Sequence, residues 1–396
     1  MKKILIIGAG MLQAYVIQRA KDLGYYVIAV DMDPNAPGFQ YADEYKVINI
    51  VDKESCLKYA IEKDIDGVLT AATDYGVLTT SFIAEKIGLK GLDYAVAKVI
   101  KNKYEVRKAM AENKVDDTPQ FFEVKSEEEL NEIQNDIKFP VIVKPADGSG
   151  SKGVSRVDNK MELFEKCKEA LRQSLSNKVL IETFIVGQEY GVESFVYDAK
   201  INVLGIMKKH MTKPPYYAEL GHTMPAGISD NLKEKIQKVV TNTISALNIN
   251  FGSVNMDLLV TSDEKVSIVD IGCRMGGNLI GSHIIPYATG IEYMENMIRA
   301  ALGEKAEFEP KFEKNIATRL LALTPGKVKE LPDFEKYKDD ERIKYIFCKL
   351  KEGDNILEYK NNLDGCGYVV VEGNTVEEAE RIAEELKQRI NRDIKR

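Results

Sequence analysis

Two aspartates and an arginine lie close together in the second half of the chain. Asp257 and Asp270 each follow apolar residues and are thirteen positions apart, with the turn 261–265 between them. On two paired strands they can face one side, where like charges repel unless a cation lies between them. Mg²⁺ prefers such oxygen ligands and commonly also binds substrate phosphates. Arg274 could then neutralise a transferring phosphoryl group, with an Asp257–Arg274 salt bridge as the alternative interpretation.

A lysine and a glycine- and serine-rich loop lie near the middle of the chain. The apolar segment 141–143 ends in Lys144, and the loop begins four residues later. Its residues are Gly148, Ser149, Gly150, Ser151, Lys152 and Gly153. Glycines let backbone N–H groups approach phosphate oxygens, and lysines supply positive charge. The pattern predicts polyphosphate binding, although its spacing is not that of a Walker loop, and a flexible hairpin with solvated lysines is the alternative.

Two glutamates follow this loop in the sequence. Glu182 interrupts an apolar run, and Glu189 comes directly after a turn that contains Gly187. A carboxylate suits a ribose diol, and a purine needs acceptors for its exocyclic amine. These glutamates fit a nucleoside site, and an edge strand with outward carboxylates explains them equally well.

A second glycine motif lies near the start of the chain. Gly8-Ala9-Gly10 follows an apolar run, and Asp31 ends the next such run. This is most of a dinucleotide-binding fingerprint, but the third glycine position holds Gln13. The alternatives are a tight strand-to-helix turn with Asp31 as a cap, an anion site at the helix N-terminus, and a nicotinamide site in an oxidoreductase.

The elements that must position these residues begin with an α/β pattern. Short apolar runs at 4–7, 26–30, 47–50 and 68–71 predict strands, and 11–23 and 53–63 predict helices. This alternation predicts an open parallel sheet, a Rossmann-like N-terminal domain over residues 1–98.

The next part of the chain does not continue this alternation of strands and helices. Helices are predicted at 98–113, 161–175, 231–247 and 287–302. A strand is expected at 139–145, followed by runs at 179–184, 190–197 and 201–207 that alternate like antiparallel strands. Strands 254–260 and 266–271 form a hairpin. We expect these elements to form an α+β domain over residues 99–305.

The last part of the chain predicts a small α/β cap. The charged segment 304–314 is typical of a linker, and runs at 317–323, 367–372 and 375–390 predict two strands and a helix. These boundaries give a C-terminal cap domain over residues 306–396.

Composition limits the classes of protein that the chain can be. It has 55 basic and 62 acidic residues, a net charge of −7, which is a poor balance for general nucleic-acid binding. Five scattered cysteines and three histidines indicate neither a disulfide framework nor a zinc site. The apolar run 4–7 is far too short to span a bilayer. We therefore expect a cytoplasmic protein with no nucleic-acid or membrane partner.

The order of these charged residues along the chain resembles the ATP-grasp superfamily. The resemblance extends from the N-terminal sheet to the cap and includes the segments 8–43 and 367–373. It is strongest to the branch of formate-dependent glycinamide ribonucleotide transformylase, biotin carboxylase, carbamoyl-phosphate synthase and the L-amino acid ligases. The fold it implies is an N-terminal open parallel sheet, a central ATP-grasp α+β domain and a C-terminal cap.

The resemblance also implies roles for individual residues. The expected ATP-binding residues are Lys103, Lys144, Gly148, Ser149, Gly150, Ser151, Lys152, Glu182, Ile185 and Glu189. Of these, Glu182 and the Ile185 backbone correspond to the adenine site, and Glu189 to the ribose site. Arg274 and Lys144 are the implied catalytic residues.

The implied metal ligands are Asp257 and Asp270, where the family usually has two glutamates. Gly272 stands where the family frequently has an asparagine ligand. Substrate contacts are expected at Glu219, His222, Asp74 and Arg319, the last with a surface salt bridge as its alternative.

The activity that the resemblance implies is an ADP-forming, ATP-dependent carboxylate–amine ligase that acts through an acyl phosphate. The expected cofactors are ATP and Mg²⁺, with Mn²⁺ as an alternative ion, and the substrates are a small carboxylic acid and an amine. A bicarbonate-using carboxylase or a carbamoyl-phosphate-synthase-like enzyme is the alternative, and a non-catalytic nucleotide sensor is the alternative from another class. Family habit also implies a homodimer.

Overall fold

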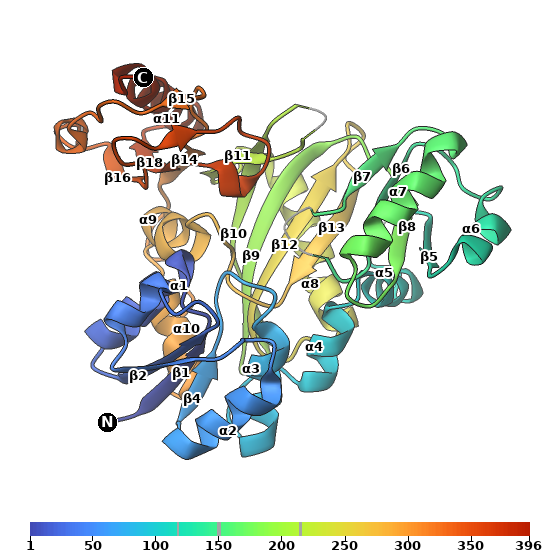
Figure 1. Cartoon of the computed structure of the whole chain (residues 1–396), viewed down its shortest axis with the longest axis horizontal. Coiled ribbons are helices and arrows are strands. Elements are labelled where there is room, and N and C mark those ends of the chain that lie inside the picture. The colour runs from blue at the N-terminus through green and yellow to red at the C-terminus, as the bar shows by residue number, and fades with distance from the viewer. Residues whose placement is uncertain (117–118, 149–151, 214–215) are drawn as a thin grey trace.

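The computed structural model describes residues 1–116, 119–148, 152–213 and 216–396. Figure 1 shows a long central sheet with the N-terminal sheet below one end, the C-terminal elements above that end, and a small sheet beyond the other. Within the described residues, no helix is long and apolar enough to cross a membrane.

The N-terminal region is the predicted parallel sheet. Its strand order is β3-β2-β1-β4, and all three pairings are parallel. The strands are β1 (Lys3–Ile7), β2 (Tyr26–Asp31), β3 (Glu44–Val47) and β4 (Gly67–Leu69). The helices are α1 (Met11–Asp22), α2 (Lys53–Lys63) and α3 (Val77–Ile87), with a 3₁₀ turn η1 (Pro37–Tyr41).

The third strand is misplaced in the sequence prediction. It runs over 44–47 rather than 47–50, because Asn49 and Asp52 use their side chains to accept hydrogen bonds from nearby backbone N–H groups. Such polar side chains favour turns and helix caps over strands. The apolar residues that follow Val47 therefore belong to the turn that leads into α2.

The predicted helix 98–113 is two helices. They are α4 (Tyr94–Ile100) and α5 (Lys103–Glu112), separated at Asn102. The backbone of Asn102 is extended, and its side chain accepts hydrogen bonds from the N–H groups of Tyr104 and Glu105. An N-cap of this kind starts a new helix, which places Lys103 at its first position.

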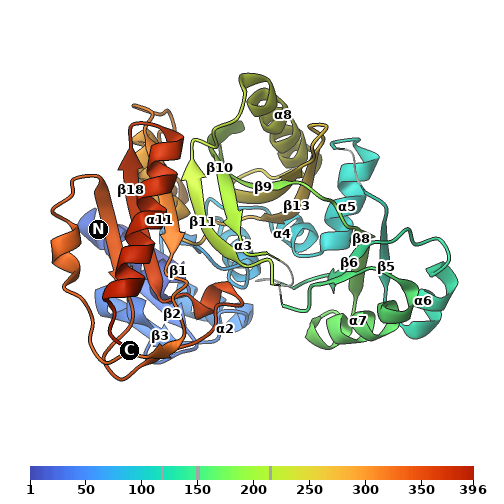
Figure 2. The same ribbon diagram turned by 90° about the horizontal axis from the view of Figure 1, so that it is seen from above.

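A small antiparallel sheet follows, with strand order β5-β8-β6-β7. Its strands are β5 (Phe121–Val124), β6 (Val141–Pro145), β7 (Ser155–Val157) and β8 (Val179–Thr183), packed with α6 (Glu127–Ile133) and α7 (Lys160–Gln173). Figure 2 shows this sheet projecting to one side of the central sheet. The run 179–184 is an antiparallel strand, as predicted, but β8 pairs with β5 and β6 and lies in a different sheet from the runs that follow it.

The central sheet has eight strands in the order β13-β12-β9-β10-β11-β14-β18-β16. Five of them come from the middle of the chain: β9 (Gln188–Tyr197), β10 (Lys200–Met211), β11 (Glu219–Met224), β12 (Gly252–Val260) and β13 (Val266–Gly272). The C-terminal part supplies β14 (Asn315–Leu320), β16 (Ile343–Cys348) and β18 (Gly367–Gly373). The predicted cap therefore continues the central sheet through the β11–β14 pairing.

Helices cover this sheet on both sides. α8 (Asp230–Ala246) precedes β12, and α11 (Val376–Asp393) packs on β14 and β18. The predicted helix 287–302 is broken into α9 (Ile285–Thr289) and α10 (Tyr293–Ala301), after a π-helical turn η2 (Ile280–Ile284). Gly290 ends α9 in a left-handed conformation, with φ of +72°. The smaller elements of the C-terminal part are β15 (Gly326–Lys327), β17 (Asn355–Ile356), η3 (Phe334–Tyr337) and η4 (Asn362–Asp364).

One apolar core joins the three parts of the chain. It includes Ile4 from β1, Phe195 from β9, Tyr293 from α10, Ile316 from β14 and Val370 from β18, all at most 1% exposed. Burying these side chains together stabilises the relative placement of the regions as well as each region. Residues that come from different regions can therefore meet at fixed positions.

The junction between β11 and β14 depends on a glycine. Gly221 has φ of +148°, and a Cβ atom there would lie 2.1 Å from the carbonyl oxygen of Thr318. Any larger residue would push the two strands apart at the only place where the central and C-terminal parts share hydrogen-bonded strands within the described residues.

We predict that Gly221→Ala lowers the free energy of unfolding by about 3 kcal/mol or more, because the new methyl group meets backbone rather than a movable side chain. Gly252→Ala is the matched control. Its φ is +95°, but no atom lies within 4 Å of the added Cβ, so only conformational strain of about 1–2 kcal/mol is expected. Urea unfolding measures both variants, and equal losses would contradict the role given to Gly221.

Candidate active site

The two aspartates lie directly opposite each other. Asp257 of β12 and Asp270 of β13 are register partners, so both side chains lie on one face of the hairpin, as predicted. They line a cleft together with Lys103, Asp74, Asn255 and Arg274, and Gly148 lies at its edge. Five of the charged residues that the sequence singles out therefore line one cleft: Asp74, Lys103, Asp257, Asp270 and Arg274.

Each aspartate contacts a lysine. Lys103 forms a short ion pair with Asp270, and Lys209 lies 2.9 Å from an oxygen of Asp257. Desolvation opposes ionisation of Asp270, but the charges of Lys103 and Lys144 outweigh it and lower its pKa to about 2. Asp270 is therefore a carboxylate at neutral pH, as an oxygen ligand for a divalent ion must be.

Lys144 and Glu182 form a buried ion network with Arg107. The Glu182 carboxylate lies 2.5 Å from the Lys144 Nζ and 2.7 Å from the Arg107 Nε, and all three side chains are at most 7% exposed. Both cations also donate to the carbonyl oxygen of Val269, next to Asp270. The network therefore fixes the strand that carries Asp270, and the Glu182 side chain faces this network instead of extending outward from an edge strand.

The remaining ATP-binding predictions lie on, or next to in the sequence, the elements that carry this network. The backbone N–H of Lys103 donates to the carbonyl oxygen of Ala146, which ties the start of α5 to the end of β6. Ile185 comes two residues after the end of β8, and Lys152, four residues after Gly148, has an exposed side chain. Ser149, Gly150 and Ser151 lie outside the described residues.

Lys209 is a site residue that the sequence analysis missed. Its side chain is 5% exposed and lies 2.7 Å from Glu189, 2.9 Å from Asp257 and 3.5 Å from Glu219. Burial disfavours its charge, but these three carboxylates outweigh that effect and raise its pKa well above the usual value. The missing signal was strand length: β10 continues to Met211, whereas the prediction ended it at 207.

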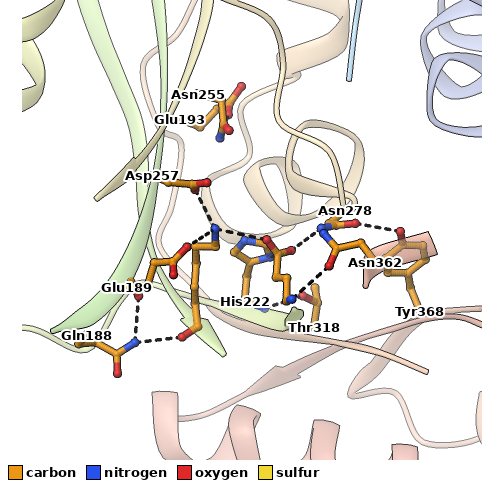
Figure 3. Close-up of polar contacts among 12 residues, drawn as sticks. Gln188, Glu189, Glu193, His222, Asn255, Asp257, Asn278, Thr318, Asn362 and Tyr368 are labelled. Carbon is orange, nitrogen blue, oxygen red and sulfur yellow. Dashed lines mark hydrogen bonds and ion pairs between the residues drawn. The ribbon is translucent and has the colours of Figure 1, made fainter. Parts of the chain in front are cut away.

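Glu219 and His222 lie together beside Lys209. His222 is the register partner of Lys209, and its ring nitrogen Nδ1 lies 3.4 Å from Glu219. Asn278 donates to the Glu219 carboxylate. It also accepts from the Tyr368 hydroxyl, and Figure 3 shows these two side chains together. Burial lowers the pKa of His222. This polar group lies where the central sheet, the segment after β13 and the C-terminal part meet.

Arg274 and Asp74 come from different regions and pair with each other. The Arg274 Nε lies 3.0 Å from an Asp74 oxygen, and its Nη1 donates to the Asn255 side chain at 3.0 Å. The alternative Asp257–Arg274 salt bridge is therefore not the pairing that the structure has. Asp74 lies in the turn after β4, so the N-terminal region reaches the aspartate cleft through this ion pair.

Arg319 lies apart from these groups. Its side chain is 7% exposed, lies 3.6 Å from Glu384 of α11, and donates to the carbonyl oxygen of Thr318. The structure thus brings Glu219, His222 and Asp74 to the cleft and its surroundings, and it places Arg319 against α11.

The glycine motif near the start of the chain, Gly8-Ala9-Gly10, forms a tight turn. An Asp31 oxygen accepts a hydrogen bond from the N–H of Ala9 at 2.8 Å, and Gln13 donates to the carbonyl oxygen of Ala71. Asp31 therefore caps the turn, as one of the alternatives predicted. In a dinucleotide site the same carboxylate would be directed to a ribose.

Comparisons with known proteins cover all three parts of the chain. A family model described as an ATP-grasp domain matches residues 137–282. Models described as a PylC-like N-terminal domain and as L-amino acid ligase C-terminal domain 2 match residues 4–82 and 319–395.

Full-length similarity agrees with these matches. A formate-dependent phosphoribosylglycinamide formyltransferase of Sulfurisphaera tokodaii is 26% identical, over 96% of this chain and 95% of the relative. The crystal structure of a phosphoribosylglycinamide synthetase from Anaerococcus prevotii has a TM-score of 0.80 and 26% identity, covering 100% and 98% of the two chains. An L-amino acid ligase from Bacillus licheniformis has a TM-score of 0.84 at 24% identity, covering 98% and 97%, which supports the shared fold alone.

The three domain matches follow the order in which the fold arranges its parts, and relatives align along nearly the whole chain. The protein belongs to the ATP-grasp superfamily of ADP-forming ligases.

Proposed function

We propose that this protein uses MgATP to join a small carboxylic acid to an amine through an acyl-phosphate intermediate. The observation that carries the proposal is the facing pair Asp257 and Asp270, which share one cleft with Lys103 and Arg274. Lys144 lies beside the same strand and donates to the carbonyl oxygen of Val269. This is the charge pattern that phosphoryl transfer needs, since negative charge on the transferring group must be balanced.

The residues present suit a divalent ion that is also bound by phosphate. Asp257 and Asp270 supply hard oxygen donors on one face. Among the described residues, no group of three or more His, Cys, Asp or Glu side chains forms a complete metal site. Mg²⁺, or Mn²⁺ in its place, would thus take its remaining ligands from ATP and water, and when bound it would offset charge on the phosphates.

The chain's own residues would support two steps. A carboxylate oxygen of the acid attacks the γ-phosphorus, the bond to the β,γ-bridging oxygen breaks, and ADP leaves with the electron pair. The amine nitrogen then attacks the acyl carbon, phosphate leaves, and the nitrogen loses a proton. Arg274 and Lys103 would stabilise the negative charge in the first step, and Lys144 would support both the phosphates and the strand of Asp270.

The acceptor side of the site has its own polar group. Glu219, His222 and Asn278 lie next to Lys209, which contacts the aspartate cleft through Asp257. We infer that these side chains, with Asp74 on the N-terminal side, contact the acid and the amine. Glu189, also bound to Lys209, is retained as the ribose ligand.

Two further expectations remain proposals. We infer a cytoplasmic location because all five cysteines are free thiols in the structure. We also propose that the protein forms a homodimer, on the basis of the family resemblance alone.

The first test is substrate-dependent ADP release across a panel of carboxylic acids, amino acids, dipeptides and nucleotides, each supplied with amines. We predict that Asp270→Asn lowers this release by at least about 100-fold, because one charged metal ligand and the partner of Lys103 are lost together. Asp263→Asn is the matched control in the exposed turn of the same hairpin, and its activity should stay within about twofold of the wild type.

Other outcomes identify the alternatives. Binding of ATP by calorimetry, without ADP release for any acid and amine, would favour a nucleotide sensor. Release stimulated by bicarbonate alone would favour a carboxylase. Full activity of Asp270→Asn would contradict the metal role proposed for this residue.

A second prediction concerns Lys209. We predict that Lys209→Met lowers the free energy of unfolding by about 3–5 kcal/mol at pH 7.5, because Glu189, Glu219 and Asp257 lose their shared counter-charge. Lys208→Met is the control. It removes a partly exposed lysine from the neighbouring position, where it pairs with Glu380, and should cost less than about 1 kcal/mol.

This loss should depend on pH in a defined direction. Without Lys209 the buried carboxylates take up protons in the folded state more readily than in the unfolded state. The variant therefore regains stability as the pH falls. Its free energy of unfolding should be closer to that of the wild type at pH 5.5 than at pH 7.5. Urea unfolding at both pH values measures this, and a constant difference would contradict the cluster's role.

A further inference from the structure

A fully buried glutamate lies under the arginine of the proposed site. Glu193 of β9 has no exposed surface, and its two oxygens accept hydrogen bonds from three groups. Oε1 accepts from the Tyr293 hydroxyl at 2.5 Å, and the N–H of Gly276 donates to both oxygens, to Oε1 at 3.1 Å and to Oε2 at 3.2 Å. Oε2 accepts from the Asn255 side-chain amide at 3.0 Å. The sequence analysis assigned no role to this carboxylate.

The glutamate determines which way the Asn255 amide faces. A carboxylate can only accept, so the Nδ2 of Asn255 must point to Glu193. The Oδ1 of the same amide then faces the other way, where it accepts from the Nη1 of Arg274 at 3.0 Å. Asn255 also lies two residues before Asp257 on β12, so both side chains are on the same face of the strand, as Figure 3 shows.

The residue opposite Asn255 leaves space for the arginine. Gly272 is the register partner of Asn255 on β13. A Cβ atom at position 272 would lie 2.8 Å from an Asp74 oxygen and 3.1 Å from the Arg274 Cζ. The guanidinium thus lies over a glycine, held by Asp74 on one side and by Asn255 on the other.

We propose that Glu193 is a positioning residue for phosphoryl transfer: it fixes the Asn255 amide, and through that amide it fixes the Arg274 guanidinium. The proposal rests on the proposed function, in which Arg274 stabilises the transferring phosphoryl group. Glu193 is the only group in this series of hydrogen bonds that can accept but not donate. It therefore fixes the direction of every bond from Tyr293 and Asn255 onward to Arg274, because Asn255 and Tyr293 can each act as donor or acceptor.

The test exchanges the two polar groups. In Glu193→Gln the new amide nitrogen replaces Oε2 and faces the Nδ2 of Asn255, donor against donor. If the Asn255 amide turns over, its nitrogen meets Arg274. If the introduced glutamine amide turns over instead, its nitrogen takes the place of Oε1, which is the closer of the two acceptors of the Gly276 N–H. In the double variant Glu193→Gln/Asn255→Asp, the introduced glutamine donates to one oxygen of the introduced aspartate. The second oxygen of that aspartate accepts from Arg274. Both contacts again pair a donor with an acceptor, and Arg274 donates as it does in the wild type.

We expect Glu193→Gln to lower kcat by about 10- to 100-fold, with the KM for ATP within about threefold of the wild type. The double variant should recover kcat to within about threefold of the wild type. Assays are run at pH 8, because burial raises the pKa of Glu193 to about 7. Ser194→Ala is the control: it removes a neighbouring buried hydroxyl that has no hydrogen-bond partner among the described residues and should leave kcat unchanged.

Two results would overturn the inference. One is wild-type kcat in Glu193→Gln, and the other is a double variant no better than this single variant. If the wild type itself forms no ADP with any acid and amine, the proposed function fails. Crystal structures of the wild type, the single variant and the double variant then test the inference by themselves, since only the single variant should displace the Arg274 guanidinium.

Discussion

Two carboxylates on neighbouring strands repel each other unless positive charge lies beside them. The pairing of β12 with β13 imposes this situation by making Asp257 and Asp270 register partners. In the structure two lysines from outside the hairpin supply the charge, Lys103 from the start of α5 and Lys209 from β10. The elements around the hairpin, among them β10 and the start of α5, place these two lysines beside the aspartates.

The sheet order and the helix break explain how they arrive. β9 lies between β12 and β10, so Lys209 spans one strand to reach Asp257. Asn102 breaks the helical segment and makes Lys103 the first residue of α5, where its backbone N–H also bonds to Ala146. The C-terminal part extends the same sheet, so the polar group around Glu219 is attached to the strand next to Lys209. One continuous sheet thus carries the nucleotide side and the acceptor side of the proposed site.

The sequence predicted the N-terminal sheet, the hairpin and the paired aspartates because each follows from local patterns. Alternating apolar runs define the strands, and the turn 261–265 sets the strand register that places Asp257 opposite Asp270. Three features of the structure could not be predicted from local sequence patterns. The pairing of β8 with β5 and β6, rather than with β9, is a choice between sheets that no local pattern records. The break at Asn102 depends on a side-chain cap inside an otherwise helical run. The Asp74–Arg274 pair joins residues two hundred positions apart and requires the packed core that fixes the N-terminal region.

The lysines beside the aspartates also define what nucleotide binding has to change. Asp270 contacts Lys103 and Asp257 contacts Lys209, so each proposed metal ligand already has a counter-charge. A divalent ion that arrived alone would have to compete with both lysines and would leave their charges unpaired. An ion that arrives with a triphosphate offers Lys103 new anionic partners in exchange for Asp270. Lys209 would need no such exchange, because Glu189 and Glu219 would stay in contact with it if Asp257 turned to the ion. The three carboxylates around Lys209 would therefore leave one of them free to bind a metal while the buried ammonium stays neutralised. That is a physical reason for one buried lysine to contact the proposed ribose, acceptor and metal ligands together.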